Sequence, residues 1–111
     1  MTKQLLIDSP RGIDMNKISV KTMVGVQCGT EVEGLRLKDH LFPLLKSGEK
    51  VELDFEGVEL ASSTFFNASI GQAFETFGEQ FIDEHMVCSN LKRRVRFVLN
   101  RTLSTHYRKV V

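Results

Sequence analysis

Tryptophan is absent from this chain of 111 residues, and tyrosine, proline and cysteine are scarce, with one, two and two copies. The two cysteines, Cys28 and Cys88, are too few for the set of disulfides that stabilises small secreted domains. We therefore expect reduced thiols and a cytoplasmic protein. The sequence also has no segment rich in proline, glycine or serine, so no linker is visible, which predicts a single domain over residues 1–111.

Long apolar runs are missing as well. No run approaches the ~18 residues of a membrane-spanning helix, and the first eight residues hold no apolar stretch long enough for a signal peptide. We therefore expect no contact with a membrane. Disorder is excluded by what the chain does contain, because hydrophobic residues make up 41% of it, phenylalanine occurs 8 times and the net charge is only +1.

Charge is unevenly distributed along the chain. Between residues 49 and 84, nine acidic residues stand against one basic residue, Lys50, whereas residues 89–111 hold seven basic residues and no acidic one. This asymmetry is typical of a protein with two surfaces for partners, or of two halves that face each other or the solvent.

Four apolar segments predict strands, at residues 3–7, 18–26, 51–55 and 85–88. Ser9-Pro10-Arg11-Gly12 is a turn sequence, which would allow the first two strands to pair as a hairpin.

Three further segments predict helices. The first covers residues 31–47, begins with a capping box at Thr30 and contains Pro43, which predicts a kink. The second covers residues 64–77 and stops at Gly78. The third begins at Ser89 or Asn90 and continues to residue 103.

The order of these elements predicts an α/β fold, an open mixed sheet of about four strands with three helices packed on it. The residues expected in the core are Leu53, Phe55, Val58, Phe66, Phe74, Val87, Val95 and Leu99. The apolar face expected on the first helix consists of Val32, Leu35, Leu41, Phe42, Leu44 and Leu45.

Three hydroxyls, Ser62, Ser63 and Thr64, stand where the second helix begins. A helix start carries unpaired N–H groups and partial positive charge, so a phosphate on one of these hydroxyls would be tolerated there. The same residues also suit a purely structural cap of the helix. Nearby acids, Glu52, Glu56, Glu59 and Glu75, are expected to strengthen the repulsion that such a phosphate exerts on a docked partner.

The ordered set of motifs resembles the STAS-like domains of unknown function, which are related to the STAS domains of anti-sigma-factor antagonists. The residues that carry the resemblance span roughly positions 18–103 and are Asp54-Phe55, Gly57-Val58, Ser62-Ser63-Thr64-Phe65, Gly71, Gly78 and Ser89-Asn90. Two positions depart from the antagonists, since Ser62 stands where they carry an aspartate and Phe65 where they carry a glycine.

The resemblance implies a STAS-like fold and a non-catalytic regulatory module of bacterial signalling, which binds a serine-kinase-like or sigma-regulatory protein. It implies that the second helix and the strand edge before it form the docking face, for which we select Phe65, Asn67, Ser69 and Gln72. By register, Thr64 matches the phosphorylated position of the antagonists, and Ser63 and then Ser62 follow it as candidates. Phe65 and Phe66 point about 100° apart on a helix. This leaves two alternatives: one of them is exposed and available for a homodimer, or both are buried.

The alternative function is a nucleic-acid-binding module that uses the basic last helix, with Lys92, Arg93, Arg94 and Arg96 as its patch. We rank it second because no aromatic residue is expected to interleave with these bases, since Phe97 is predicted near the apolar side of the helix and Tyr107 stands alone. No metal, cofactor or enzymatic activity is expected. His85 and Cys88 would point to opposite faces of a strand, and no phosphate-binding loop or nucleophile motif is present.

Overall fold

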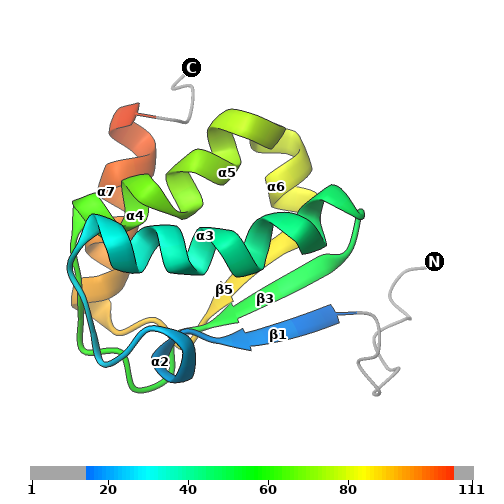
Figure 1. Cartoon of the computed structure of the whole chain (residues 1–111). Helices are drawn as coiled ribbons and strands as arrows, with labels where there is room; N and C mark the ends of the chain where they lie inside the picture. The colour runs from blue at the N-terminus through cyan, green and yellow to red at the C-terminus, as the bar shows by residue number, and fades with distance from the viewer. Residues whose placement is uncertain (1–14, 107–111) are drawn as a thin grey trace.

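The computed structural model describes residues 15–106, and Figure 1 shows their arrangement. The elements follow in the order β1 (Met15–Ser19), α2 (Val20–Met23), β2 (Gln27–Cys28), α3 (Glu31–Lys46), β3 (Lys50–Asp54), β4 (Leu60–Ala61), α4 (Ser63–Ala68), α5 (Ile70–Phe77), α6 (Glu79–His85), β5 (Met86–Ser89) and α7 (Arg93–His106). The predicted α/β class is therefore confirmed. The strand predicted at residues 3–7, and with it the hairpin, lies outside the described residues.

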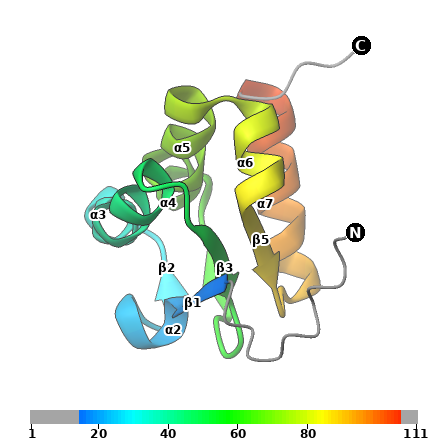
Figure 2. The ribbon, with the colours of Figure 1, turned by 90° about the vertical axis from the view of Figure 1, so that its right-hand side faces the viewer.

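The described strands form two parallel sheets. The larger has the order β1-β3-β5 and the smaller pairs β2 with β4. The prediction of one mixed sheet is thus replaced, in the described part of the chain, by two sheets whose strands all run parallel. Figure 2 shows α3 and α7 on opposite sides of the molecule, with α4 and α5 between them.

The strand predicted at residues 18–26 is wrong beyond Ser19. Ser19 accepts a hydrogen bond from the Thr22 backbone N–H at 3.2 Å and so caps the short helix α2. Gly25, with φ of 139°, then turns the chain into β2. A period-2 pattern of apolar residues was a misleading signal here because the cap and the glycine end the strand early.

Helix α3 confirms the predicted capping box at Thr30 and continues as one helix through Pro43. Its buried face differs from the expected one. Val32 and Leu35 are 65% and 40% exposed, whereas Gly34 and Leu37 are buried. The helix is rotated in this way because its glycine, and not its nearby valine, meets the neighbouring helix α4.

The helix predicted at residues 64–77 is two helices, α4 and α5, which meet at Ser69. Gly78 ends α5 as predicted, with φ of 92°. Helix α6 was not predicted, and it includes His85. The strand predicted at residues 85–88 is therefore found one residue later, at Met86–Ser89. The last helix begins at Arg93, since Asn90 adopts φ of 56° in the preceding turn and does not cap it.

The core confirms seven of the eight predicted residues. Leu53, Phe55, Val58, Phe66 and Val95 are fully buried, and Phe74 and Leu99 are each 5% exposed. Val87 is wrong, because it is 44% exposed. None of the helices described between residues 15 and 106 is long and apolar enough to cross a membrane.

Candidate functional site

The start of α4 is fixed to the rest of the fold by Ser62. Its hydroxyl accepts a hydrogen bond from the Phe65 N–H at 3.1 Å and donates one to the Gly29 carbonyl at 2.9 Å. The Ser62 N–H donates to the Cys28 carbonyl, also at 2.9 Å. Ser62 therefore caps the helix and links the segments that contain β2 and β4 by hydrogen bonds. Because its hydroxyl is used in both contacts, it is unsuited to carry a phosphate.

Ser63 and Thr64 occupy the first turn of α4 and are both exposed. Thr64 was expected to be the best phosphoacceptor unless the helix needed it as a cap. Because Ser62 is the cap, both neighbouring hydroxyls remain accessible. The structure thus places all three predicted hydroxyls at the start of α4 and separates the one structural hydroxyl from the two exposed ones.

Two buried phenylalanines follow these hydroxyls in α4 and anchor the helix in the core. Phe65 and Phe66 are both fully buried, with ring centroids 5.3 Å apart, and Phe66 also lies 6.1 Å from the ring of Phe55. The selection of Phe65 as a partner-binding side chain is therefore wrong. An exposed phenylalanine was also the stated reason for a homodimer, and this reason does not hold for either residue.

The close approach of α3 to α4 depends on Gly34. A Cβ atom at this position would lie 2.6 Å from the Phe65 carbonyl oxygen and 2.7 Å from the Ala68 Cβ. Such distances are well below van der Waals contact, so only glycine allows this crossing. Sequence analysis missed Gly34, because a glycine in a helix without a turn signal is not distinguished by its neighbours in sequence.

The other docking residues selected on α4 and α5 are placed unequally. Ser69 is fully buried and donates its hydroxyl hydrogen bond to the Phe65 carbonyl at 2.8 Å, so its side chain is structural. Asn67 and Gln72 are half-buried, and the Gln72 amide donates to the Asn67 carbonyl at 3.3 Å. Of the hydroxyls and docking residues selected from the sequence, the accessible ones are therefore Ser63, Thr64, Asn67 and Gln72.

A groove of about 520 Å³ runs between the start of α4 and helix α7. Ser62 and Ser63 line one wall, and the opposite wall includes Phe97 and Arg101. The predicted hydroxyl site is therefore adjacent to a basic side chain from a distant part of the sequence. Neither spacing nor composition could have shown this neighbour, because it depends on how α4 packs against α7.

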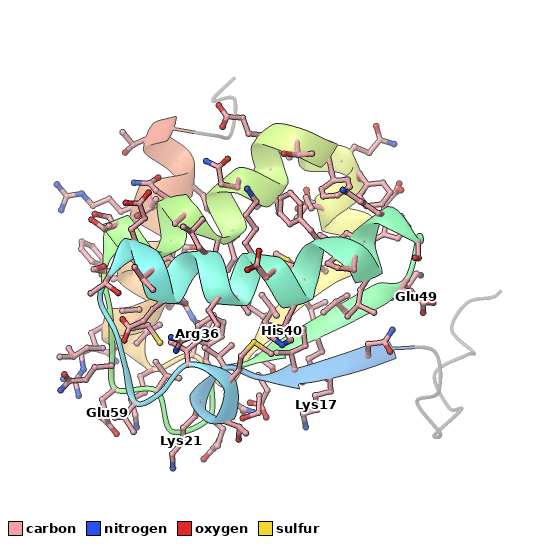
Figure 3. All side chains as sticks on the ribbon, in the orientation of Figure 1. Lys17, Lys21, Arg36, His40, Glu49 and Glu59 are labelled. Carbon is pink, nitrogen blue, oxygen red and sulfur yellow. The ribbon has the colours of Figure 1, made fainter. Side chains whose placement is uncertain are left out.

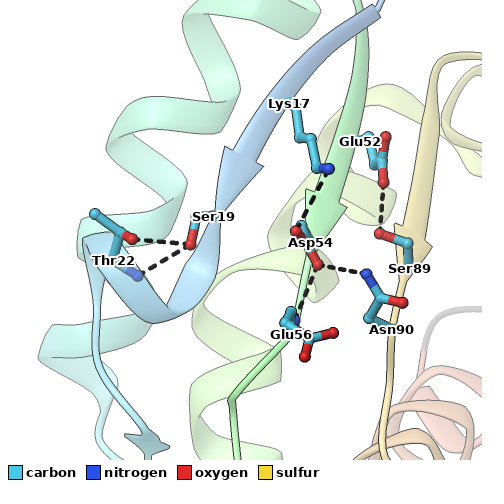
Figure 4. Close-up of polar contacts among 8 residues, drawn as sticks. All are labelled: Lys17, Ser19, Thr22, Glu52, Asp54, Glu56, Ser89 and Asn90. Carbon is cyan, nitrogen blue, oxygen red and sulfur yellow. Dashed lines mark hydrogen bonds and ion pairs between the residues drawn. The ribbon is translucent and has the colours of Figure 1, made fainter.

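Two of the four acids expected around the hydroxyls, Glu59 and Glu52, have partners elsewhere. Glu59 forms ion pairs with Arg94 at 3.1 Å and Lys92 at 3.7 Å. Glu52 lies on the opposite side of the sheet and accepts a hydrogen bond from the Ser89 hydroxyl at 2.6 Å (Figure 4). A phosphate at Ser63 would share the groove with Arg101, whereas the expected repulsion of a docked partner stays a prediction.

The predicted basic patch is divided by the geometry of α7. Lys92, Arg93 and Arg94 line one open hollow together with Phe97. Arg96 lies in a separate pocket of about 370 Å³, beside Asn100 of α7 and Asp83 of α6. Phe97, which sequence analysis placed near the apolar side of the helix, is 62% exposed among the bases.

Asp54, at the carboxyl end of β3, connects Lys17 of β1 with the turn after β5 (Figure 4). Its carboxylate accepts hydrogen bonds from the Asn90 amide at 2.8 Å and the Glu56 N–H at 2.9 Å, and Lys17 lies 3.6 Å away. These partners, the Asn90 amide foremost, hold the pKa of Asp54 below its usual value. The carboxylate is a structural link between two of the motifs that the sequence analysis singled out.

A second hollow, on the β1 side of α3, contains Lys17, Arg36 and His40, which Figure 3 labels. Nδ1 of His40 lies 3.1 Å from the Arg36 carbonyl oxygen, a contact within the helix. Lys17 of this hollow also lies 3.6 Å from the Asp54 carboxylate, so part of the positive charge is compensated, and we read the three residues as a solvated surface.

Neither cysteine is a candidate nucleophile. Burial raises the pKa of the Cys28 thiol to about 11, with a smaller contribution from Glu33, and raises that of Cys88 to about 12. Both are free thiols. Within residues 15–106, no three His, Cys, Asp or Glu side chains come together in a group able to hold a metal ion.

A family model described as a STAS-like domain of unknown function matches residues 33–96. The matched segment begins in α3, just before Gly34, and ends in α7, so it contains the hydroxyls of α4 and more than half of the chain. No curated protein and no solved structure matches the chain.

Proposed function

Because the chain belongs to the family of STAS-like domains of unknown function, we propose that it is a non-catalytic regulatory module that binds a protein partner. The proposed contact surface is the α4 docking face, which we define as Ser63, Thr64, Asn67 and Gln72. By its likeness to the anti-sigma-factor antagonists, the expected partner is a serine-kinase-like or sigma-regulatory protein of the cytoplasm.

The observation that carries the proposal is the separation of the three hydroxyls at the start of α4. Ser62 alone supplies the cap, whereas Ser63 and Thr64 are exposed and have no part in it. A capped helix with buried Phe65 and Phe66 beneath it presents its outer side chains in a fixed geometry. Such preorganisation favours binding, since little conformational entropy is lost when a partner docks.

Phosphorylation of Ser63 or Thr64 is the regulatory step of this proposal. A phosphate adds about −1.5 to −2 charges, which alters a docking surface directly. Ser63 has the more favourable surroundings, because it shares the groove with Arg101. Thr64 is the better match to the antagonists by register, so the two hydroxyls remain alternatives.

Affinity capture from the native host tests the proposal when two baits are compared in parallel. The first bait is the wild-type chain and the second carries both Ser63→Glu and Thr64→Glu. We expect a protein of the serine-kinase-like or sigma-regulatory class to be enriched by the first bait and lost from the second. Equal recovery of every protein by the two baits would contradict the α4 docking face.

A further inference from the structure

The outward face of α7 carries an aromatic residue between two arginines, a feature that the proposed function does not use. Val95, Leu99 and Leu103 bury the inner face of the helix. Phe97 is 62% exposed near the centre of the opposite face, with Arg93 four residues before it and Arg101 four residues after it. At 1.5 Å per residue, these side chains follow one another at intervals of roughly 6 Å along the helix. We call these three residues the α7 stripe.

The arginines of the α7 stripe are free to bind an anion. Glu59 forms ion pairs with Lys92 and Arg94, which lie on one flank of the helix start. Arg93 and Arg101 are exposed, and neither forms an ion pair with any side chain in the described part of the chain. Charge therefore remains uncompensated on both sides of the exposed phenylalanine.

The stripe also connects two hollows on the surface. Phe97 lines the open hollow of about 580 Å³ with Arg93, and it lines the groove beside α4 with Arg101. Hydroxyls of Ser63 and Thr105 face the same groove. A chain of anionic groups that followed these hollows would meet an arginine, an aromatic ring, a second arginine and two hydroxyl donors in turn.

We propose that the α7 stripe binds single-stranded nucleic acid without sequence preference. A base stacks on the Phe97 ring, and the phosphates on either side bind Arg93 and Arg101, the combination of aromatic platform and cationic groove that single strands require. The hydroxyls donate to phosphate or sugar oxygens. The local charge supports a polyanion as the ligand, since α7 and the turn before it, residues 89–106, contain five basic residues and no acidic one. A duplex is the poorer ligand, because its bases are already stacked on one another.

The test is fluorescence anisotropy of the full chain with a labelled twelve-nucleotide oligodeoxythymidine, beginning at 50 mM salt, with no partner protein present. We expect a Kd in the micromolar range, as for other binding of this non-specific kind, and weaker binding to a duplex of equal length. Phe97→Ala should weaken binding about tenfold, from the value of one stacked base. The double variant Arg93→Gln, Arg101→Gln should reduce the slope of log K against log salt by about 1.4.

Matched controls remove the same chemistry from α3, on the other side of the molecule (Figure 2). Arg36→Gln with Lys46→Gln removes two exposed charges, and Val32→Ala removes exposed apolar surface. Both controls should leave the affinity within twofold of wild type. The proposal is overturned if the wild-type chain does not bind the single strand, if it binds the duplex equally well, or if the controls weaken binding as much as the stripe variants. In the first case, an acidic protein becomes the better ligand for the stripe.

Discussion

The two helices that form the groove differ in where their phenylalanines lie. Helix α4 buries them in the core, whereas α7 exposes its phenylalanine to solvent. In α4, Phe65 and Phe66 are fully buried and the exposed positions carry hydroxyls. In α7, aliphatic residues supply the buried face and Phe97 is exposed among arginines. The same residue type is thus part of the scaffold in one helix and part of the binding surface in the other. Burial, and not residue type, distinguishes the two uses.

Phenylalanine-to-alanine substitutions should show the largest difference between the two helices in the free energy of unfolding. We expect Phe66→Ala to reduce the free energy of unfolding by about 3–5 kcal/mol, because it removes a fully buried ring and leaves a cavity. Phe97→Ala should change it by no more than about 0.5 kcal/mol, since its ring is largely in solvent. Chemical denaturation of the two variants measures both values. Comparable losses would show that Phe97 is packed in solution and would remove the contrast between the helices.

A smaller effect is expected where α3 crosses α4. Gly34→Ala places a methyl group against the Phe65 carbonyl and the Ala68 side chain, and overpacking of this kind costs about 1–3 kcal/mol. Gly29→Ala is the matched control, because nothing lies within 4 Å of the added atom and the backbone needs no positive φ. Thermal unfolding should show a clear decrease in Tm for the first variant only. A Tm unchanged by Gly34→Ala would mean that the two helices are farther apart than described.

The smallest effect concerns the hydroxyls themselves. Ser62→Ala removes the cap of α4 and the hydrogen bond to Gly29, for which we expect a loss of about 1–2 kcal/mol. Ser63→Ala and Thr64→Ala should each stay within about 0.5 kcal/mol of wild type. The same denaturation experiment compares the three variants. If Thr64→Ala proved the most destabilising, the cap would be misassigned and Ser62 would again become a candidate for modification.

Local signals were sufficient to predict those parts of the fold that local chemistry determines. The capping box at Thr30, the strand at β3 and the end of α5 at Gly78 are confirmed, because each depends on residues adjacent in sequence. The rotation of α3 could not be predicted, since it depends on Gly34 meeting a helix thirty residues away. The break at Ser69 was also hidden, because the apolar pattern continues across it.

The candidate site shows the same division. The position of the hydroxyls followed from the sequence, but which hydroxyl is the cap depends on the Gly29 carbonyl supplied by the segment before α3. Arg101 could not be assigned to the site, because no motif connects it to Ser63. Phe97 was placed on the wrong side of α7, because the next residue, Val98, packs against the core whereas Phe97 itself turns to solvent.

The most direct test of the α4 docking face is a titration of the purified partner, obtained by affinity capture, against three single variants. Ser63→Glu and Thr64→Glu place a negative charge on the face, whereas Gln80→Glu places the same charge on an exposed position of α6, a helix that contributes no residue to it. We predict that at least one of the first two weakens binding tenfold or more, equivalent to about 1.4 kcal/mol, while Gln80→Glu and thermal stability stay close to wild type. Equal affinities for all three variants and the wild-type chain would show that the hydroxyls belong to the scaffold alone and would contradict the account.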